Sequence, residues 1–150
     1  MKKQILIVTM LLVGLVSGAQ EYNTVKDICY TAKSDAYAQE RLKLDVYYPE
    51  GTKDCPVIVW FHGGGIEAGQ KEIPEKLKGK GYVVIGANYR LLPKVTIDKT
   101  LDDAAEAVAW AFRHAAEYGG DPKKIVVTGH SAGGYLEMIS GCMLRSVARL

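Results

Sequence analysis

The pattern of apolar and polar side chains divides the chain into strands and helices that alternate along the sequence. Three short runs are apolar throughout, namely residues 57–61, 82–87 and 125–127. Such runs predict parallel strands that are covered on both faces. Residues 42–47 instead alternate apolar with polar side chains, which predicts a half-exposed antiparallel strand near a sheet edge. A weaker strand is expected over residues 25–30.

Two helical segments separate the strands. A short lysine-rich helix is expected over residues 72–80, and a long one over residues 98–118, with Gly119 as its C-terminal stop. The apolar residues predicted to share the buried face of the long helix are Leu101, Ala105, Val108, Phe112 and Ala115. Alternating strands and helices, joined by right-handed crossovers, form a mainly parallel sheet with helices on both faces, so the expected fold class is α/β.

The first nineteen residues have the composition of an export signal. Lys2 and Lys3 precede an uncharged stretch over residues 5–16, and small residues follow at 17–19. The apolar stretch is too short to span a bilayer comfortably. We therefore expect a signal peptide over residues 1–19, one domain over residues 20–150, and a secreted or periplasmic protein without membrane attachment after cleavage. The alternative is an uncleaved N-terminal anchor.

Charge and cysteine content narrow the classes of partner and cofactor. Cleavage after residue 19 would remove two of the 19 basic residues and none of the 17 acidic ones, which leaves a formally neutral chain. No basic stripe is present, so a nucleic-acid partner is not expected. Cys29, Cys55 and Cys142 fit no zinc spacing, and we expect neither a metal site nor a cofactor. Export would permit a disulfide, but isolated buried thiols are the favoured interpretation.

Ser131 lies in the segment Gly-His-Ser-Ala-Gly-Gly, residues 129–134, directly after an apolar strand. This G-x-S-x-G pattern between a strand and a helix is typical of a nucleophile elbow, in which a strained turn exposes the serine oxygen. Glycines two residues to either side leave room where strand and helix pass closely. The following helix directs free N–H groups and its positive dipole end toward the serine. Ser131 is therefore the candidate nucleophile.

A second motif follows the strand over residues 57–61. Its sequence is His-Gly-Gly-Gly, and successive glycines let backbone N–H groups turn toward a ligand without steric cost. We expect the N–H groups of Gly64, Gly65 and Ala132 to form an oxyanion hole. The residues expected to support the two motifs are His62, Gly63, Gly129, His130 and Gly133.

With these two motifs the chain resembles the α/β-hydrolase family, and most of all its secreted carboxylesterases. The resemblance runs from about residue 42 to about residue 135. It includes the segment Asn-Tyr-Arg-Leu-Leu-Pro at residues 88–93, an Asp-Asp pair at residues 102–103 and the turn at residues 119–122. The resemblance implies a small-molecule ester substrate and hydrolysis by a Ser-His-acid triad, in the chain order serine, acid, histidine.

The sequence after Ser131 contains no histidine and no aspartate. It thus supplies the serine and most of the oxyanion hole, and we expect residues 20–150 to be the N-terminal part of an α/β-hydrolase fold, incomplete at the C-terminus. The strand at residues 125–127 would then lie at an open edge, through which copies could associate. Two alternatives remain open: a catalytically inactive fragment, and a peptidase- or amidase-type hydrolase.

Several polar residues have structural interpretations. His62 is expected to order the glycine loop by hydrogen bonding rather than to act as a base. His130 is expected to pack at the elbow, because adjacent side chains on a tight turn point apart, and His114 is expected at or near the helix surface. Asp102 or Asp103 is expected to cap the long helix or to pair locally, because the family's acid follows the serine.

Overall fold

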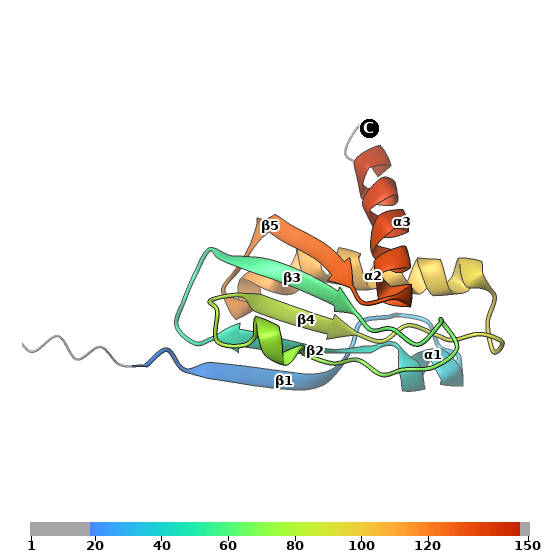
Figure 1. The fold of residues 1–150 in the computed structure, drawn as a ribbon, viewed down its shortest axis with the longest axis horizontal. Helices are drawn as coiled ribbons and strands as arrows, with labels where there is room; N and C mark the ends of the chain where they lie inside the picture. Colours follow the sequence, from blue (N-terminus) through green and yellow to red (C-terminus); the bar gives the residue numbers. More distant parts are fainter. Residues whose placement is uncertain (1–18, 148–150) are drawn as a thin grey trace, which may run out of the picture.

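The computed structural model describes the backbone of residues 19–147 (Figure 1). The predicted signal peptide, residues 1–19, lies outside the described residues except for residue 19. Among the helices that the structure does describe, none is both long and apolar enough to cross a membrane.

Five strands form one mixed sheet in the order β1-β2-β4-β3-β5. Their bounds are Tyr22–Cys29 for β1, Lys43–Pro49 for β2, Cys55–Phe61 for β3, Val83–Ala87 for β4 and Gly120–Gly129 for β5. The three apolar runs are confirmed as the parallel strands β3, β4 and β5, while β1 and β2 pair in antiparallel fashion. The expected cover on both faces holds for β4, which is buried along its whole length, but is wrong for β5, where Val126 is 57% exposed. This arrangement is the expected α/β fold class, with an antiparallel extension at one edge.

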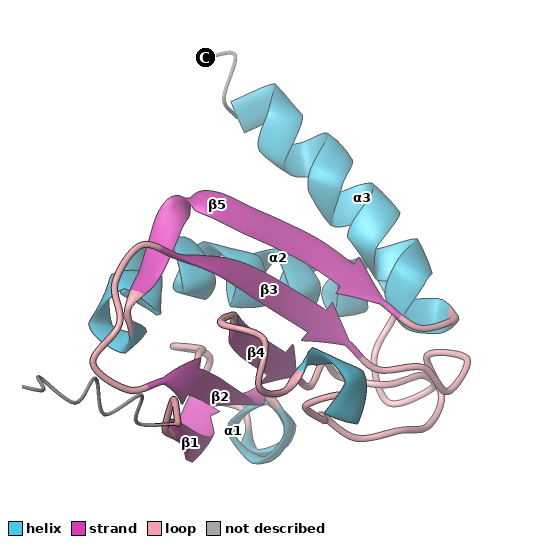
Figure 2. Cartoon of the chain, turned by 60° about the vertical axis from the view of Figure 1, so that its left-hand side comes forward, coloured by secondary structure: helices cyan, strands magenta, loops and turns pink. Residues whose placement is uncertain are grey.

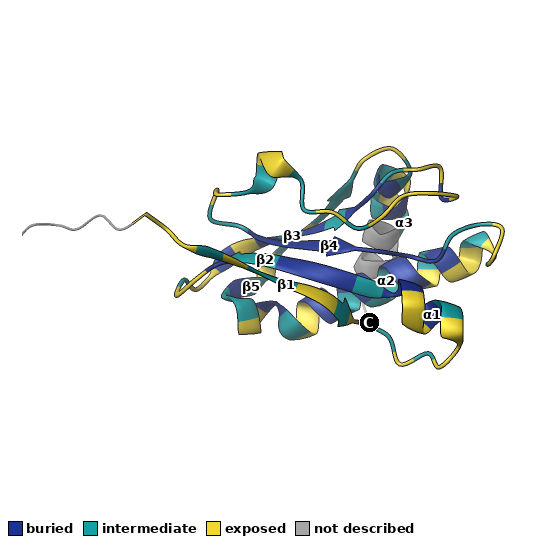
Figure 3. Ribbon diagram, turned by 90° about the horizontal axis from the view of Figure 1, so that it is seen from below, coloured by how far each residue is buried: buried dark blue, intermediate teal, exposed yellow. Residues whose placement is uncertain are grey.

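The two faces of the sheet are covered differently (Figures 2 and 3). The long helix α2, Ile97–His114, lies against one face, and α3, Ala132–Val147, packs against β5, β3 and α2. The segment that contains the 3-10 turn η1, Glu75–Leu77, crosses the opposite face. It approaches β4 so closely that a Cβ atom on Gly86 would lie 2.2 Å from the carbonyl oxygen of Glu72.

The expected helix over residues 72–80 is wrong, because only the single turn η1 forms there. Pro74 immediately precedes the turn, and Gly79 and Gly81 follow it with positive φ angles of 69° and 77°. Proline removes a helical N–H donor, and positive φ angles end helical geometry. The lysine-rich composition indicated a solvent-exposed segment, but the flanking breakers determine its backbone.

A short helix, α1, spans Ala36–Arg41 and was not predicted. Its N-cap is Asp35, whose carboxylate accepts a hydrogen bond from the N–H of Ala38 at 2.9 Å. Six residues are too few to produce a clear helical period. The cap pattern was therefore the only local signal for this element.

The predicted buried face of α2 is only partly right. Val108 is buried, as is Ala115 in the following 3-10 turn η2 (Ala115–Tyr118), but Phe112 is 42% exposed. The residues of α2 that are buried are Thr100, Asp103, Ala104, Ala107, Val108, Trp110 and Ala111. Relative to the predicted orientation, the helix is rotated about its axis. Asp103 faces inward because of a polar contact, and small alanines lie against the sheet. Gly119 ends the helical segment with φ 78°, as expected.

The side chains of β2, β3 and β4 meet those of α2 and α3 in one core. Its fully buried apolar residues include Leu44, Val46, Val57, Val59, Phe61, Val83, Ile85, Val108 and Leu136. On β2 the expected half-exposed pattern fails at Asp45, which is buried. Its carboxylate accepts hydrogen bonds from the N–H of Asp27 and from Lys71. Pairing of this kind makes the burial of a charge tolerable.

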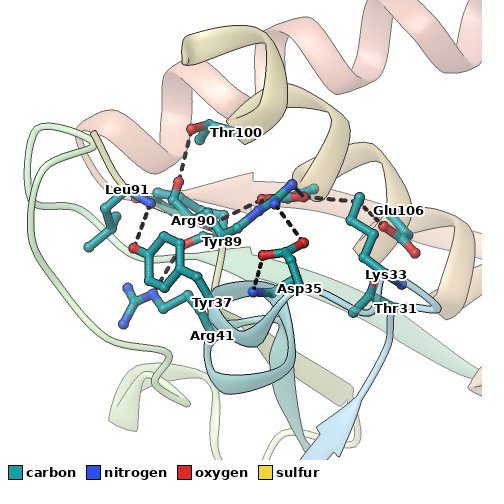
Figure 4. A network of polar contacts seen from close by, with 12 residues as sticks. Thr31, Lys33, Asp35, Tyr37, Arg41, Tyr89, Arg90, Leu91, Thr100 and Glu106 are labelled. Atoms are coloured by element: carbon teal, nitrogen blue, oxygen red, sulfur yellow. Dashed lines mark hydrogen bonds and ion pairs between the residues drawn. The ribbon is translucent and has the colours of Figure 1, made fainter. Parts of the chain in front are cut away.

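A buried ion pair holds α2 to the segment that follows β4 (Figure 4). Arg90 donates from Nε and Nη2 to the two carboxylate oxygens of Asp103 at 2.8 and 2.9 Å. Asp103 has no exposed surface, and Lys33 also reaches its carboxylate at 3.0 Å. The hydroxyl of Thr100 donates to the Arg90 carbonyl at 2.9 Å. Asp103 therefore pairs with a different element and does not cap its helix, whose N-cap is Thr96.

We expect the substitution Asp103→Asn to lower the free energy of unfolding by about 3–5 kcal/mol, because it removes the buried counter-charge of Arg90 and leaves only the longer contact with the half-exposed Asp35 at 3.4 Å. The neighbouring Asp102 is exposed on the same helix. Asp102→Asn is therefore the matched control, with an expected change within about 0.5 kcal/mol. Urea unfolding of both variants measures the difference. Equal effects of the two substitutions would contradict a special role for the buried pair.

Within the described residues, β5 pairs with β3 on one side only. Val126 in the middle of β5 is 57% exposed, and Tyr135 and Met138 on α3 are exposed as well. An exposed apolar edge strand can pair with a second chain.

We therefore expect the polypeptide of residues 20–150, expressed by itself, to associate or to aggregate. Val126→Lys should reduce this association, because a charge on an edge strand opposes edge-to-edge pairing. Ala36→Lys adds the same charge at an exposed position on α1, which lies away from β5 (Figure 1), and serves as the control. Sedimentation velocity at several concentrations tests the prediction. A monodisperse wild-type monomer with a sharp cooperative thermal transition would show it to be wrong.

Candidate active site

Ser131 lies at the apex of a sharp turn between β5 and α3. The strand ends at Gly129, the helix begins at Ala132, and Ser131 itself has a φ angle of 56°. The turn is closed by a hydrogen bond from the N–H of Gly133 to the carbonyl of His130 at 2.9 Å. Ser131 is exposed, and its hydroxyl has no hydrogen-bond partner in the described part of the chain. The left-handed backbone and exposed hydroxyl give the geometry expected of a nucleophile elbow.

The elbow packs directly against the end of β3. The N–H of His130 donates to the carbonyl of Phe61 at 3.2 Å. A Cβ atom on Gly133 would lie 2.0 Å from the same carbonyl oxygen, and one on Gly129 would lie 2.5 Å from the carbonyl carbon of Gly133. Only glycine allows this close approach of the three backbone segments.

The glycine loop begins where β3 ends and lies beside the elbow. A Cβ atom built on Gly63 would lie 3.4 Å from the Cβ atom of Ser131 and 2.9 Å from Nδ1 of His130. Gly64, Gly65 and Ile66 all have positive φ angles, of 116°, 65° and 66°. The structure thus brings the two motifs together, as expected from their positions after neighbouring strands.

The loop leaves backbone donors free. The carbonyl of Gly64 accepts hydrogen bonds from the N–H groups of Glu67 and Ala68 at 3.1 and 2.9 Å, which fixes the turn. The N–H groups of Gly64, Gly65 and Ala132 donate to no acceptor among the residues that the structure describes. Unpaired N–H groups in left-handed turns and at a helix N-terminus are suited to bind an anion.

His62 is buried behind the loop, with 3% of its surface exposed. Its ring stacks on Tyr89 at a centroid distance of 4.4 Å, and Nδ1 lies 2.7 Å from the carbonyl oxygen of Gly63. The other nitrogen, Nε2, lies 3.2 Å from Nη2 of Arg41. Because both ring nitrogens have partners, neither is free to accept a proton from Ser131.

Burial lowers the pKa of His62, and the positive charge of Arg41 lowers it further, while the hydrogen bond to the Gly63 carbonyl acts in the opposite direction. His62 is therefore neutral at physiological pH. Burial also raises the pKa of Tyr89 to about 12, which keeps its hydroxyl protonated. That hydroxyl donates to the His62 carbonyl at 2.7 Å and holds the start of the loop.

The other two histidines form no hydrogen bond with Ser131 in the described part of the chain. His114 stacks on Trp110 and pairs with Glu117 at 2.8 Å on the last turns of the long helical segment. The exposed His130 lies against Gly63. Among the described residues there is also no group of three or more side chains suited to hold a metal ion.

Sequence reasoning missed Arg41, which reaches the loop from α1. No local pattern distinguishes this arginine from a solvent-exposed one, because its partners lie 21, 28 and 48 residues away along the chain. Tyr89 and Arg90 were noticed only through the family resemblance, and their contacts with His62 and Asp103 are tertiary.

We expect Gly133→Ala to lower the free energy of unfolding by about 1–3 kcal/mol, because the new methyl group would overlap the backbone of Phe61. Gly134→Ala, at the next position of the same helix, is the control. A Cβ atom there would meet no neighbour closer than 3.8 Å, so stability should be unchanged or raised by up to about 1 kcal/mol. Thermal unfolding of both variants provides the measurement. If Gly133→Ala is as stable as Gly134→Ala, the close packing of the elbow on β3 is wrong.

Known proteins share both the sequence and the fold of this chain. It is 35% identical over 112 residues to the carboxylesterase NlhH of Mycobacterium tuberculosis, an alignment that covers 71% of this chain and 35% of that protein. It is 33% identical over 109 residues to the carboxylic ester hydrolase LipN of the same organism, with 69% of this chain and 29% of that protein covered. The chain thus spans about a third of the length of these relatives.

Two solved structures have similar folds. Esterase B of Lactobacillus rhamnosis, in a structure inhibited by a tributyrin phosphonate, superposes with a TM-score of 0.66 at 28% identity, covering 77% of this chain and 38% of the other. A bacterial heroin esterase superposes with a TM-score of 0.69 at 26% identity, covering 91% of this chain and 43% of the other.

The family model described as BD-FAE matches residues 44–147, which include both motifs. The carboxylic ester hydrolases among the relatives support ester hydrolysis at the level of the family. The chain therefore belongs to the BD-FAE family, within the esterases that have an α/β-hydrolase fold.

Proposed function

We propose that the whole protein is a secreted or periplasmic serine carboxylesterase whose nucleophile is Ser131. The observation that carries the proposal is the left-handed, exposed Ser131 beside a glycine loop with free N–H donors. Neither motif is specific by itself. Their contact across two neighbouring parallel strands is the arrangement that acyl transfer requires.

In this proposal the Ser131 oxygen attacks the carbonyl carbon of a small-molecule ester while its proton passes to a histidine. The negative charge that develops on the carbonyl oxygen is stabilised by the N–H groups of Gly64, Gly65 and Ala132. The ester C–O bond then breaks, and the alcohol leaves with the proton from the histidine. In the second half-reaction water attacks the acyl-serine and gives a proton to the histidine. The acid product leaves and Ser131 recovers its proton. The positive end of the α3 dipole favours the same charge.

The histidine and the carboxylate of the triad are proposed to come from residues of the whole protein outside these 150. Two observations support this. None of the three histidines of the chain forms a hydrogen bond with Ser131 among the described residues. The chain also spans only about a third of the length of its carboxylesterase relatives. The alternative is that the protein supplies no such residues and is a catalytically inactive fragment.

We expect Ser131→Ala, made in the protein encoded by the complete reading frame, to lower kcat for p-nitrophenyl acetate by at least about 1,000-fold, because it removes the nucleophile. Ser34→Ala is the control, because Ser34 is exposed in the loop before α1 and should leave kcat unchanged. Hydrolysis followed by release of p-nitrophenol measures both variants. Full activity of Ser131→Ala would overturn the proposal.

The same assay on residues 20–150 alone provides a second arm. We expect little turnover, because an oxyanion hole without a general base retains only about 10³–10⁴-fold acceleration over water. Robust turnover that depends on Ser131 would instead assign the base to His62, His114 or His130, and the proposed source of the triad histidine would be wrong.

A further inference from the structure

Arg41, at the end of α1, is a buried cation outside both motifs. It is 8% exposed and forms no ion pair with a carboxylate in the described part of the chain. Its guanidinium donates from Nε to the Tyr89 carbonyl at 3.0 Å and from Nη2 to the Gly69 carbonyl at 2.7 Å. Nη2 also lies 3.2 Å from Nε2 of His62. Figure 4 shows Arg41 below Tyr89. Burying a charge without a counter-charge costs free energy, so the presence of Arg41 at this position calls for a specific reason.

The contact with Arg41 fixes the proton on His62. A guanidinium has only donors, so Nε2 of His62 must accept and carries no hydrogen. In the neutral ring the hydrogen therefore sits on Nδ1. From there it is donated to the carbonyl oxygen of Gly63 at 2.7 Å. Arg41 thus selects the one tautomer that can hold this carbonyl.

Holding the Gly63 carbonyl orients the next N–H group. In a trans peptide the C=O bond and the following N–H bond point in opposite directions. When His62 holds the Gly63 oxygen, the N–H of Gly64 must point away from His62. This N–H is one of the free donors beside Ser131, and it would be lost to the site if the peptide turned over.

Arg41 also holds the far end of the loop. A Cβ atom on Gly69 would lie 2.3 Å from both the Gly63 oxygen and Nδ1 of His62, so the returning chain covers this hydrogen bond directly. The carbonyl of the same Gly69 accepts from Arg41. One guanidinium therefore ties the beginning of the loop, at His62, to its end, at Gly69.

We propose that Arg41 is a positioning residue for the oxyanion hole, which acts through His62 and Gly69 to set the orientation of the Gly63–Gly64 peptide. The inference rests on the proposed esterase function. Arg41 does not touch the substrate in this proposal, so its removal should affect the stabilisation of the transition state more than the binding of the ester.

The first test reads the His62 ring directly and needs no activity. In protein labelled with ¹⁵N-histidine, long-range ¹H–¹⁵N spectra should show the wild-type His62 neutral at pH 7, with its hydrogen on Nδ1. In Arg41→Met its pKa should rise by about one unit, because a positive charge within hydrogen-bond distance is removed. Arg113→Met, an exposed arginine on α2, should leave the pKa unchanged. A hydrogen on Nε2 in the wild type would overturn the inference.

The second test separates charge from geometry. Arg41→Lys retains the charge, but a single ammonium group cannot donate to the same three acceptors in the same fork. We expect the His62 pKa of this variant to stay near the wild-type value, while kcat falls about 10–100-fold with KM unchanged, as it does in Arg41→Met. The control Arg113→Met should keep the wild-type kcat. Wild-type kcat in folded Arg41→Lys and Arg41→Met would overturn the inference.

The outcomes distinguish this inference from the proposed function. If Ser131→Ala keeps full activity, the esterase proposal fails, while the His62 tautomer and pKa still test the role of Arg41. If Ser131→Ala is inactive but both Arg41 variants are fully active, only the inference about Arg41 fails. If neither Arg41 variant folds, the tautomer of wild-type His62 decides, since the inference requires the hydrogen on Nδ1.

Discussion

The parallel register between β3 and β5 determines where every residue of the candidate site lies. Phe61, the last residue of β3, pairs with Gly129, the last residue of β5. Both chains leave the sheet at the same edge, so the glycine loop and the serine turn begin side by side. The Phe61 carbonyl receives the N–H of His130 and lies where a Gly133 side chain would be. A shift of one residue in this register would separate Ser131 from the loop that is proposed to serve it.

The third parallel strand supports the site from behind. The segment after β4 carries Tyr89, which stacks on His62, and Arg90, which pairs with the buried Asp103 on α2. The hydroxyl of Tyr30 donates to the Asn88 carbonyl at 2.6 Å and anchors the beginning of the same segment. These contacts connect α2 to the segment after β4, and that segment to His62 at the beginning of the glycine loop. The buried side-chain nitrogen and oxygen atoms all have hydrogen-bond partners in the described part of the chain, which makes a second arrangement of these side chains costly.

The strands and the elbow could be predicted from the sequence because local signals determine them. Continuous apolar runs mark β3, β4 and β5, and the glycines around Ser131 mark the turn. The predicted helix over residues 72–80 failed because composition was given more weight than Pro74 and Gly79. The predicted face of α2 was only partly right, because Asp103 turns inward to meet Arg90. Contacts of this kind join residues far apart in the sequence, and no periodicity reports them.

Arg41 is the clearest example of what the sequence pattern could not give. It lies in a helix of six residues, and its three acceptors are backbone carbonyls and a ring nitrogen on other elements. Every residue has a backbone carbonyl, so the sequence does not indicate which carbonyls accept hydrogen bonds from Arg41. The motif residues could be recognised by type, whereas the group that holds them could be found only from the folded chain.

The strain in the glycine loop shows why such support is needed. Ile66 is β-branched and has a φ angle of 66°, a conformation that is unfavourable for its side chain. Its side chain is buried in the core, and its carbonyl accepts the N–H of Leu92 at 2.9 Å. The loop is therefore held in a high-energy conformation by packing at Ile66 and by hydrogen bonds at His62 and Gly69. In this conformation the N–H groups of Gly64 and Gly65 have no acceptor among the residues that the structure describes. Donors that are already oriented need no reorganisation when negative charge develops on a bound carbonyl, and this is the physical basis of the catalytic role proposed for the loop.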